Sequence, residues 1–240
     1  MFDATDSRSG PAQLSEPLER LLITIGSPKQ EKRAREHEAY QQAREREEQE
    51  VPRKAWEAAR GRRYLGCTLD NFHVTLPEQQ EVLTAIRQYA AGLDANIEAG
   101  RNVLLVGPPG TGKDHLVAAL SRLAFAGGHV LRWTSGPRLF SKLYDRMKSG
   151  GEGELIDWLA RAPILALSDP VCPDGRLTDW QQTKVYDLID RRYSNSRATW
   201  VTLNADNRED AERRIGRATI DRLREGALSL ACNWPSHRRP

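Results

Sequence analysis

A glycine-rich stretch between an apolar run and a helical pattern contains the residues best suited to chemistry. Residues 107–113 read GPPGTGK and follow the apolar run 102–107. In such a loop the glycines let backbone N–H groups turn towards phosphate oxygens, and the N-terminus of the next helix adds partial positive charge. The lysine adds a full positive charge. The sequence therefore predicts a nucleotide-binding loop made of Gly107, Pro108, Pro109, Gly110, Thr111, Gly112 and Lys113.

The residue after the lysine does not fit the usual pattern. Phosphate loops normally carry Ser or Thr at this position, with the hydroxyl on Mg²⁺, but here the residue is Asp114. A carboxylate can ligate Mg²⁺ directly, because hard cations accept oxygen ligands, although it would also repel the phosphates. Alternatively, Asp114 only stabilises the N-terminus of the helix and stays off the metal. The sequence leaves both interpretations open.

Two further candidate residues stand at the ends of expected strands. Asp169 follows the apolar run 163–168, where P-loop NTPases hold Mg²⁺ with a carboxylate; alternatively, it merely ends the strand. Asn204 ends the run 198–204 and is placed to reach a γ-phosphate, unless it is only a turn residue. Pro170 stands where many such ATPases have Glu to orient the attacking water, and proline has no side-chain acceptor. The sequence therefore indicates nucleotide binding with weakened hydrolysis.

These residues are expected on an α/β framework that begins near residue 61. From there the hydrophobic pattern alternates between short strands and longer helices, which is typical of a mainly parallel sheet covered by helices on both faces. Strands are expected at 102–107, 129–133, 163–168, 198–204 and 227–234, and helices at 115–128, 135–149, 154–162, 179–196 and 208–225.

Residues 1–60 have a different character and are expected to form a separate N-terminal arm. They contain 11 Lys+Arg and 12 Asp+Glu, a net charge of −1, whereas residues 61–240 contain 25 and 21, a net charge of +4. Apolar residues recur on one helical face within 14–25, and 29–50 is mostly charged. The pattern predicts a helix that docks on a partner protein, or else a solvated or disordered segment. The docking face would consist of Leu14, Leu18, Leu21, Leu22 and Ile25.

Composition argues against several classes of protein. No stretch approaches the roughly 18 apolar residues that a membrane span needs, and the first ten residues lack the pattern of a secretory signal. The three cysteines are far apart and form no CxxC pair, which argues against a zinc site or a disulfide framework. We therefore expect a reduced cytoplasmic protein with no membrane partner.

Basic residues on two expected helices are further candidates. On the helix at 135–149 they recur every four residues, in a stripe suited to a single-stranded nucleic acid backbone; a solvated face is the alternative. The stripe consists of Arg138, Lys142 and Arg146. The helix at 208–225 is rich in arginine, and one such residue near a subunit edge can stabilise transition-state charge on a neighbour's nucleotide. The pattern alone does not say which one.

Several stretches, taken in order, give the sequence a family resemblance. They are CTLDNFHV (67–74), GPPGTGKDHLVAAL (107–120), DLIDRRYSNSRATWVTLNA (187–205), IDRLRE (220–225) and CNWPSHRR (232–239). Over residues 61–240 the chain resembles the DnaC-type replicative helicase loaders, within the wider DnaC/IstB group of AAA+ ATPases. The phosphate loop is common to many ATPases, but the ordered set is much more specific.

This resemblance implies an AAA+ ATPase core without the usual C-terminal helical lid, using ATP and Mg²⁺. By motif match, Lys113 resembles the phosphate lysine, Asp169 the Mg²⁺ aspartate and Asn204 the first sensor. His115 follows the loop at the place where this family has His-Leu. Arg222 resembles an arginine finger that acts across subunits, which implies head-to-tail association into an open spiral.

By the same resemblance, the expected function is ATP-dependent loading of a hexameric replicative helicase onto single-stranded DNA. The N-terminal arm would grip the helicase, and the helix at 135–149 would contact the DNA. The family tolerates Asn at the position of Asp114 but usually has an acidic residue in place of Pro170, so ATP is expected to act mainly as an assembly switch. Two alternatives remain: an IstB-like transposition helper that binds duplex DNA, and an inhibitor that binds the helicase without loading it.

Overall fold

The computed structural model describes residues 35, 53–58, 61–148, 150–172 and 175–238. The chain divides into two compact units, Met1–Glu47 and Glu48–Pro240, and every element named below belongs to the second. The predicted docking face lies outside the described residues and stays a prediction; it comprises Leu14, Leu18, Leu21, Leu22 and Ile25. None of the helices in the described part is long and apolar enough to cross a membrane.

Five parallel strands form the centre of the fold, which confirms the predicted α/β class. They are β1 (Val103–Val106), β2 (Leu131–Ser135), β3 (Ile164–Ser168), β4 (Ala198–Leu203) and β5 (Leu228–Ala231). Their order in the sheet is β2-β3-β4-β1-β5, and every neighbouring pair runs parallel. The carboxyl ends of β1, β3 and β4 therefore lie together at one edge of the sheet, where open α/β folds bind their ligands.

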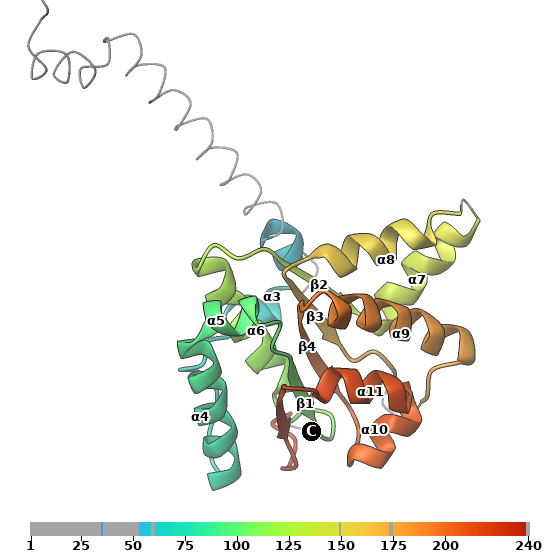
Figure 1. Cartoon of the computed structure of the whole chain (residues 1–240). Coiled ribbons are helices and arrows are strands. Elements are labelled where there is room, and N and C mark those ends of the chain that lie inside the picture. Colours follow the sequence, from blue (N-terminus) through green and yellow to red (C-terminus); the bar gives the residue numbers. More distant parts are fainter. Residues whose placement is uncertain (1–34, 36–52, 59–60, 149, 173–174, 239–240) are drawn as a thin grey trace, which may run out of the picture. The chain divides into compact units, whose positions relative to one another are not determined.

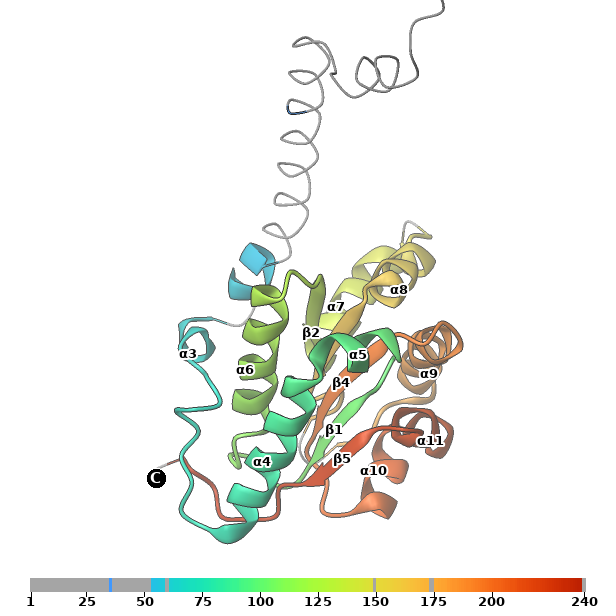
Figure 2. The ribbon, with the colours of Figure 1, turned by 60° about the vertical axis from the view of Figure 1, so that its left-hand side comes forward.

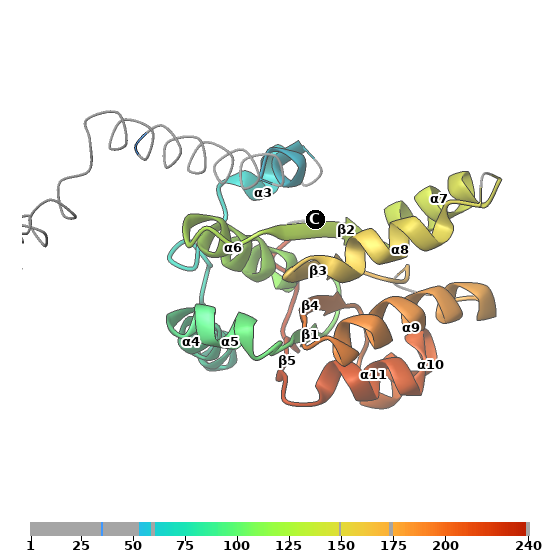
Figure 3. The same ribbon diagram turned by 45° about the horizontal axis from the view of Figure 1, so that its top comes forward.

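Helices cover both faces of this sheet. Figure 1 shows α4, α5 and α6 on one face and α7 to α11 on the other, and the turned views in Figure 2 and Figure 3 show the same layers. The helices are α3 (Arg62–Leu65), α4 (Pro77–Ala91), α5 (Leu93–Glu98), α6 (Lys113–Ala126), α7 (Gly136–Met147), α8 (Glu152–Arg161), α9 (Asp179–Ser194), α10 (Arg208–Ile215) and α11 (Arg217–Arg224).

The two-residue period of a strand divides the buried residues between two cores. In β1, Val103 and Leu105 belong to the core that includes Leu116 of α6, whereas Leu104 belongs to the core that includes Leu188 of α9. Each of these side chains is at most 3% exposed. Strands buried on both faces read as continuous apolar runs, which is why the sequence shows the strands clearly.

Two parts of the predicted helix pattern are wrong. The single helix expected at 208–225 is two helices, α10 and α11, separated by Gly216 at φ 94°. Helices α4 and α5 were not predicted, although α4 buries Val82, Leu83 and Ile86 in the same core as Leu116 of α6. A glycine inside an arginine-rich helical pattern therefore marked a break, because this backbone conformation strains other residues.

The folded unit also includes residues before the expected start of the ATPase domain. Residues 53–58 are helical, and Trp56 is 3% exposed. Its ring centroid lies 5.6 Å from that of Phe125 on α6. Removing Trp56 would therefore open the core that supports the phosphate loop.

Candidate functional site

The loop between β1 and α6 has the backbone shape that the glycine pattern predicts. Gly110 and Gly112 have φ values of 86° and 89°, a region that favours glycine. A Cβ on Gly110 would lie 2.0 Å from Oγ of Ser236, and one on Gly112 would lie 2.7 Å from the Phe72 ring. Both positions therefore require glycine for conformation and for space.

Lys113 points back into its own loop. Its Nζ donates hydrogen bonds to the carbonyls of Gly107 at 2.8 Å and Pro108 at 2.7 Å, and to Oδ1 of Asn204 at 2.9 Å. The side chain is buried, and burial lowers the pKa of this ammonium while the charge of Asp169 opposes the shift. A phosphate oxygen that reaches Lys113 would therefore replace one of these carbonyl acceptors.

Asp169 and Asn204 meet at the carboxyl ends of β3 and β4. Nδ2 of Asn204 donates to Oδ1 of Asp169 at 2.8 Å, so Lys113, Asn204 and Asp169 form one hydrogen-bonded row. Asp169 has φ 42°, and its backbone N–H donates to the carbonyl of Thr202 at 3.0 Å. Burial, followed by the charge of Asp114, raises the pKa of Asp169 to about 6. The motif residues therefore come together from three separate parts of the chain.

Asp114 lies beside this row and is held by two hydroxyl groups. Ser168 Oγ donates to its two carboxylate oxygens at 2.8 and 3.1 Å, and Thr202 Oγ1 donates at 3.0 Å. Asp114 and Asp169 line the same cavity, so two carboxylates are available to a hard cation. No group of three or more His, Cys, Asp or Glu residues in the described ranges forms a metal site by itself. Mg²⁺ is usually held by one or two carboxylates with phosphates and water, and Asp114 and Asp169 are two such carboxylates.

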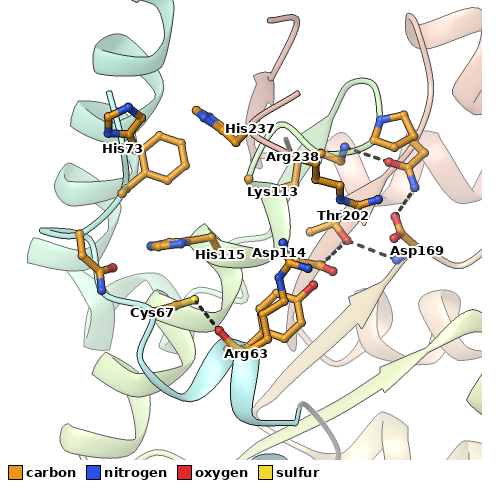
Figure 4. A pocket seen from close by; sticks show the side chains of 17 residues that line it. Arg63, Cys67, His73, Lys113, Asp114, His115, Asp169, Thr202, His237 and Arg238 are labelled. Atoms are coloured by element: carbon orange, nitrogen blue, oxygen red, sulfur yellow. Dashed lines mark hydrogen bonds between the residues drawn. The ribbon is translucent and has the colours of Figure 1, made fainter. Parts of the chain in front are cut away.

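The cavity of about 310 Å³ at this site has two chemically different ends. In Figure 4, Lys113, Asp114 and Asp169 lie at one end, and His115 and His237 lie at the other. At the second end the ring centroid of Phe72 lies 5.5 Å from that of His115 and 5.9 Å from that of His237. His115 is fixed by a 2.8 Å contact between its Nε2 and the carbonyl of Thr68. The first end suits phosphates and the second suits an aromatic base.

The segment after β5 closes over the phosphate loop. Trp234 Nε1 donates to the carbonyl of Thr111 at 2.9 Å, and the backbone N–H of His237 donates to the carbonyl of Gly110 at 2.9 Å. Arg238 lines the cavity beside Lys113 (Figure 4). No helix follows β5 within the residues up to 238 that the structure describes. Sequence reasoning did not assign these tail residues to the site, although CNWPSHRR contributed to the resemblance.

Pro170 occupies a buried position next to Asp169. The backbone N–H of Gly136, at the start of α7, donates to the carbonyl of Asp169 at 3.2 Å, and a Cβ on Gly136 would lie 2.1 Å from the Pro170 carbonyl oxygen. The chain is therefore closely packed at the position where other ATPases orient water. Pro170 itself offers no side-chain acceptor.

The predicted arginine finger and the predicted basic stripe do not line the cavity. Arg222 does not line it; its Nε donates to Oδ1 of Asp190 on α9 at 2.6 Å. Arg138, Lys142 and Arg146 are exposed on α7, as a basic stripe requires. Neither arrangement tests the roles assigned to these residues.

Comparison with known proteins identifies related sequences. The model of the IstB-like ATP binding protein family matches residues 72–238. The replicative helicase loader DnaC of Escherichia coli K12 is 31% identical over 181 residues, which cover 73% of this chain and 70% of DnaC. DnaC of Buchnera aphidicola subsp. Acyrthosiphon pisum is 28% identical over 182 residues, covering 73% of this chain and 71% of that protein.

Solved structures show the same architecture. The crystal structure of the DnaC helicase loader is similar with a TM-score of 0.63 and 26% identity, covering 71% of this chain and 99% of that one. The replication initiator DnaA bound to AMPPCP and single-stranded DNA has a TM-score of 0.58 and 18% identity, covering 71% of this chain and 50% of that one. The second likeness concerns the fold alone.

Proposed function

Because the chain belongs to the DnaC/IstB group of AAA+ ATP-binding proteins, we propose that it loads a hexameric replicative helicase onto single-stranded DNA. Its curated relatives in Escherichia coli and Buchnera aphidicola are replicative helicase loaders. ATP binds in the cavity at the phosphate loop, and residues 1–60 grip the helicase. Subunits join head to tail when ATP is bound, with Arg222 of one subunit at the nucleotide of the next.

The contrast between the ordered phosphate loop and Pro170 carries the proposal that ATP is mainly an assembly switch. Lys113, Asn204 and Asp169 form a continuous hydrogen-bonded row, whereas the position after Asp169 has no water-orienting group. A residue that orients the attacking water is one of the recurring parts of phosphoryl-transfer sites, and hydrolysis is expected to be slow without it. The site therefore suits a protein that holds ATP as a marker of state.

Magnesium fits the same geometry. Asp169 and Asp114 would hold the ion, and Mg²⁺ neutralises charge on the phosphates when it is bound. The hydrogen bonds from Ser168 and Thr202 keep the Asp114 carboxylate at the ends of β3 and β4. This geometry supports the interpretation in which Asp114 ligates the metal over the one in which it only stabilises the helix.

Two alternative functions lead to different behaviour. An IstB-like transposition helper should bind duplex DNA in the presence of ATP and need no helicase. A helicase-binding inhibitor should form a complex that single-stranded DNA does not release. The 31% identity to a replicative helicase loader over 70% of that protein favours loading over both.

The test is the mass of complexes formed with the host replicative helicase, measured by light scattering with ATP, with ADP and without nucleotide. The full chain is compared with a variant that lacks residues 1–52, because this deletion retains the buried Trp56. We expect a complex with the full chain in ATP and none with the shortened chain. Release on addition of single-stranded DNA would distinguish a loader from an inhibitor.

A matched pair of substitutions separates docking from charge. Leu18→Gln with Leu22→Gln should abolish the complex, whereas Glu16→Gln with Glu19→Gln should leave it intact. A helicase complex that forms without residues 1–52 would contradict arm-mediated docking. Duplex DNA binding in ATP, with no helicase complex under any condition, would favour the transposition helper.

A further inference from the structure

The Arg222 guanidinium is held between side chains from one face of α9. Its Nε donates to Oδ1 of Asp190 at 2.6 Å. Its Cζ lies 4.6 Å from the ring centroid of Tyr186 and 5.7 Å from that of Tyr193. Residues 186, 190 and 193 are spaced by four and three, so they share one helical face. We call Tyr186, Asp190 and Tyr193 the arginine cradle.

The cradle is itself anchored to α11. The hydroxyl of Tyr193 donates to Oε2 of Glu225, directly after α11, at 2.6 Å. Helix α9 therefore contacts Arg222 through an ion pair and two rings, and α11 holds the second ring in return. A long arginine side chain loses rotamer freedom when it is fixed, and the cradle restricts this side chain before any partner arrives.

The cradle leaves the outer nitrogens of Arg222 available. Among the described residues only its Nε donates a hydrogen bond, while its two Nη atoms donate none. The side chain is 26% exposed. The two Nη atoms of a guanidinium form a planar fork that fits a phosphate or carboxylate. Arg222 does not line the cavity of its own chain, so its fork does not face the nucleotide site of the same molecule.

We infer that Tyr186, Asp190 and Tyr193 are positioning residues that present the Nη atoms of Arg222 to the phosphates of a nucleotide bound by a second copy of this chain. The inference rests on the proposed function, in which Arg222 acts across subunits. Asp190 fixes the rotation of the guanidinium through Nε, and the tyrosine rings restrict its swing. A pre-organised fork raises the affinity of the contact because less freedom is lost on binding.

The simplest competing explanation is an ordinary surface ion pair. Exposed pairs contribute little to stability and often nothing measurable, and such a pair would not affect assembly. Helix α9 supplies a matched control, because Asp187 pairs with Arg191 and not with Arg222. Asp190→Ala and Asp187→Ala each remove one ion pair from the same helix, but only the first reaches Arg222.

The experiment measures ATP-dependent self-association of the full chain by light scattering over a range of protein concentrations. We expect Asp190→Ala to weaken association by about tenfold, as for the loss of a hydrogen bond to a charged group. Asp187→Ala should associate as the unchanged protein does. Tyr186→Phe, which retains the ring, should associate normally, whereas Tyr186→Leu should associate more weakly.

Mixing two variants provides a readout that a general folding defect would not give. Lys113→Ala subunits lack the phosphate lysine but keep Arg222 in its cradle. Asp190→Ala subunits keep the nucleotide site but lack the cradle. We expect neither variant alone to associate in ATP at concentrations where their mixture forms dimers. In the mixture, the nucleotide site of an Asp190→Ala subunit can contact Arg222 of a Lys113→Ala subunit, so one interface is intact.

The same measurements separate failure of the inference from failure of the proposed function. One possible result is that Arg222→Ala fails to associate alone but associates with Lys113→Ala, while Asp190→Ala associates normally. In that case the cradle has no positioning role, but Arg222 still acts on the nucleotide of a second subunit. If Arg222→Ala associates normally, the proposed trans contact is itself wrong. Stronger association of Asp190→Ala would show that Asp190 withholds the arginine, which also overturns the inference.

Discussion

The position of Asp114 shows how one residue can be understood only with its neighbours. The loop lacks the usual hydroxyl, yet hydroxyls from Ser168 and Thr202 approach the same point from β3 and β4. They hold the Asp114 carboxylate in the cavity that Asp169 also lines, and the pKa of Asp169 is raised to about 6 by burial and then by that charge. Two carboxylates and one lysine thus line the same partly enclosed cavity, and a divalent cation would reduce the repulsion between the two carboxylates.

This crowding predicts that Asp169→Asn stabilises the protein at neutral pH. The native pKa of about 6 exceeds the reference value of 3.8. Native Asp169 therefore keeps its proton over a range in which the unfolded chain has lost it, and its contribution to stability falls as pH rises through that range. We expect the variant to gain about 1–3 kcal/mol at pH 7. Asn also tolerates the left-handed backbone at φ 42°.

Urea unfolding with and without the substitution, between pH 4 and 7, checks this prediction. The gain should shrink as pH falls from about 6 to about 4. Asp145→Asn, on the exposed part of α7, serves as the control and should change stability by less than about 0.5 kcal/mol. A loss of stability at pH 7 in Asp169→Asn would mean that attraction to Lys113 outweighs burial.

At the scale of elements, the sequence indicated the sheet well and its surroundings less well. All five strands and the loop between β1 and α6 were predicted, because parallel strands are apolar throughout and glycines mark the phosphate turn. The single helix predicted at 208–225 is two helices, α10 and α11, because Gly216 separates them. Helix α4, with Pro77 at its start, carries enough polar residues to conceal its buried face.

Arg192 illustrates a contact that no local pattern could reveal. It stands in an arginine-rich part of α9, where a solvated side chain is the ordinary expectation, yet it is 0% exposed. Its guanidinium donates to the carbonyls of Leu159, Ala160 and Ala162 at the end of α8, and to Thr199 of β4. Orphan carbonyls at a helix end need partners, and here an arginine distant in sequence supplies them. The tail residues over the loop were missed for the same reason: their partners are tertiary.

The basic stripe on α7 gives a prediction at this scale. If Arg138, Lys142 and Arg146 contact phosphates, replacing all three by Gln should weaken binding of single-stranded DNA regardless of its sequence. The slope of log K against log salt concentration should decrease in magnitude by about 2, since each phosphate contact to a single strand contributes about 0.7. Fluorescence anisotropy at several salt concentrations measures this slope.

A control for the stripe lies across the sheet. Arg87 on α4 pairs with Asp70, and Arg87→Gln removes one positive charge from the opposite layer, where the triple variant removes three from the stripe. Its salt slope should match that of the unchanged protein. Equal slopes in the triple variant and the unchanged protein would show that the stripe is only a solvated face.

At the scale of the whole folded unit, the nucleotide site and Arg222 belong to different layers. The phosphate loop leads into α6 on one face of the sheet, whereas Arg222 lies on α11 on the other (Figure 2). A contact between the site of one copy and the arginine of another therefore joins two different surfaces. Such heterologous contacts extend at both ends unless the rotation between copies closes a ring.

This asymmetry predicts that one kind of defective subunit terminates assembly. A Lys113→Ala subunit can place its Arg222 at the nucleotide of a neighbour, but its own nucleotide site cannot bind the Arg222 of another subunit. It therefore adds at one end of the assembly and blocks further growth at that end. Substoichiometric Lys113→Ala should therefore lower the mean mass of ATP-dependent assemblies, measured by light scattering, whereas the same amount of unchanged protein should raise it. An assembly that stays at two copies at every protein concentration would instead indicate a symmetric interface, in which neither surface is left free to extend.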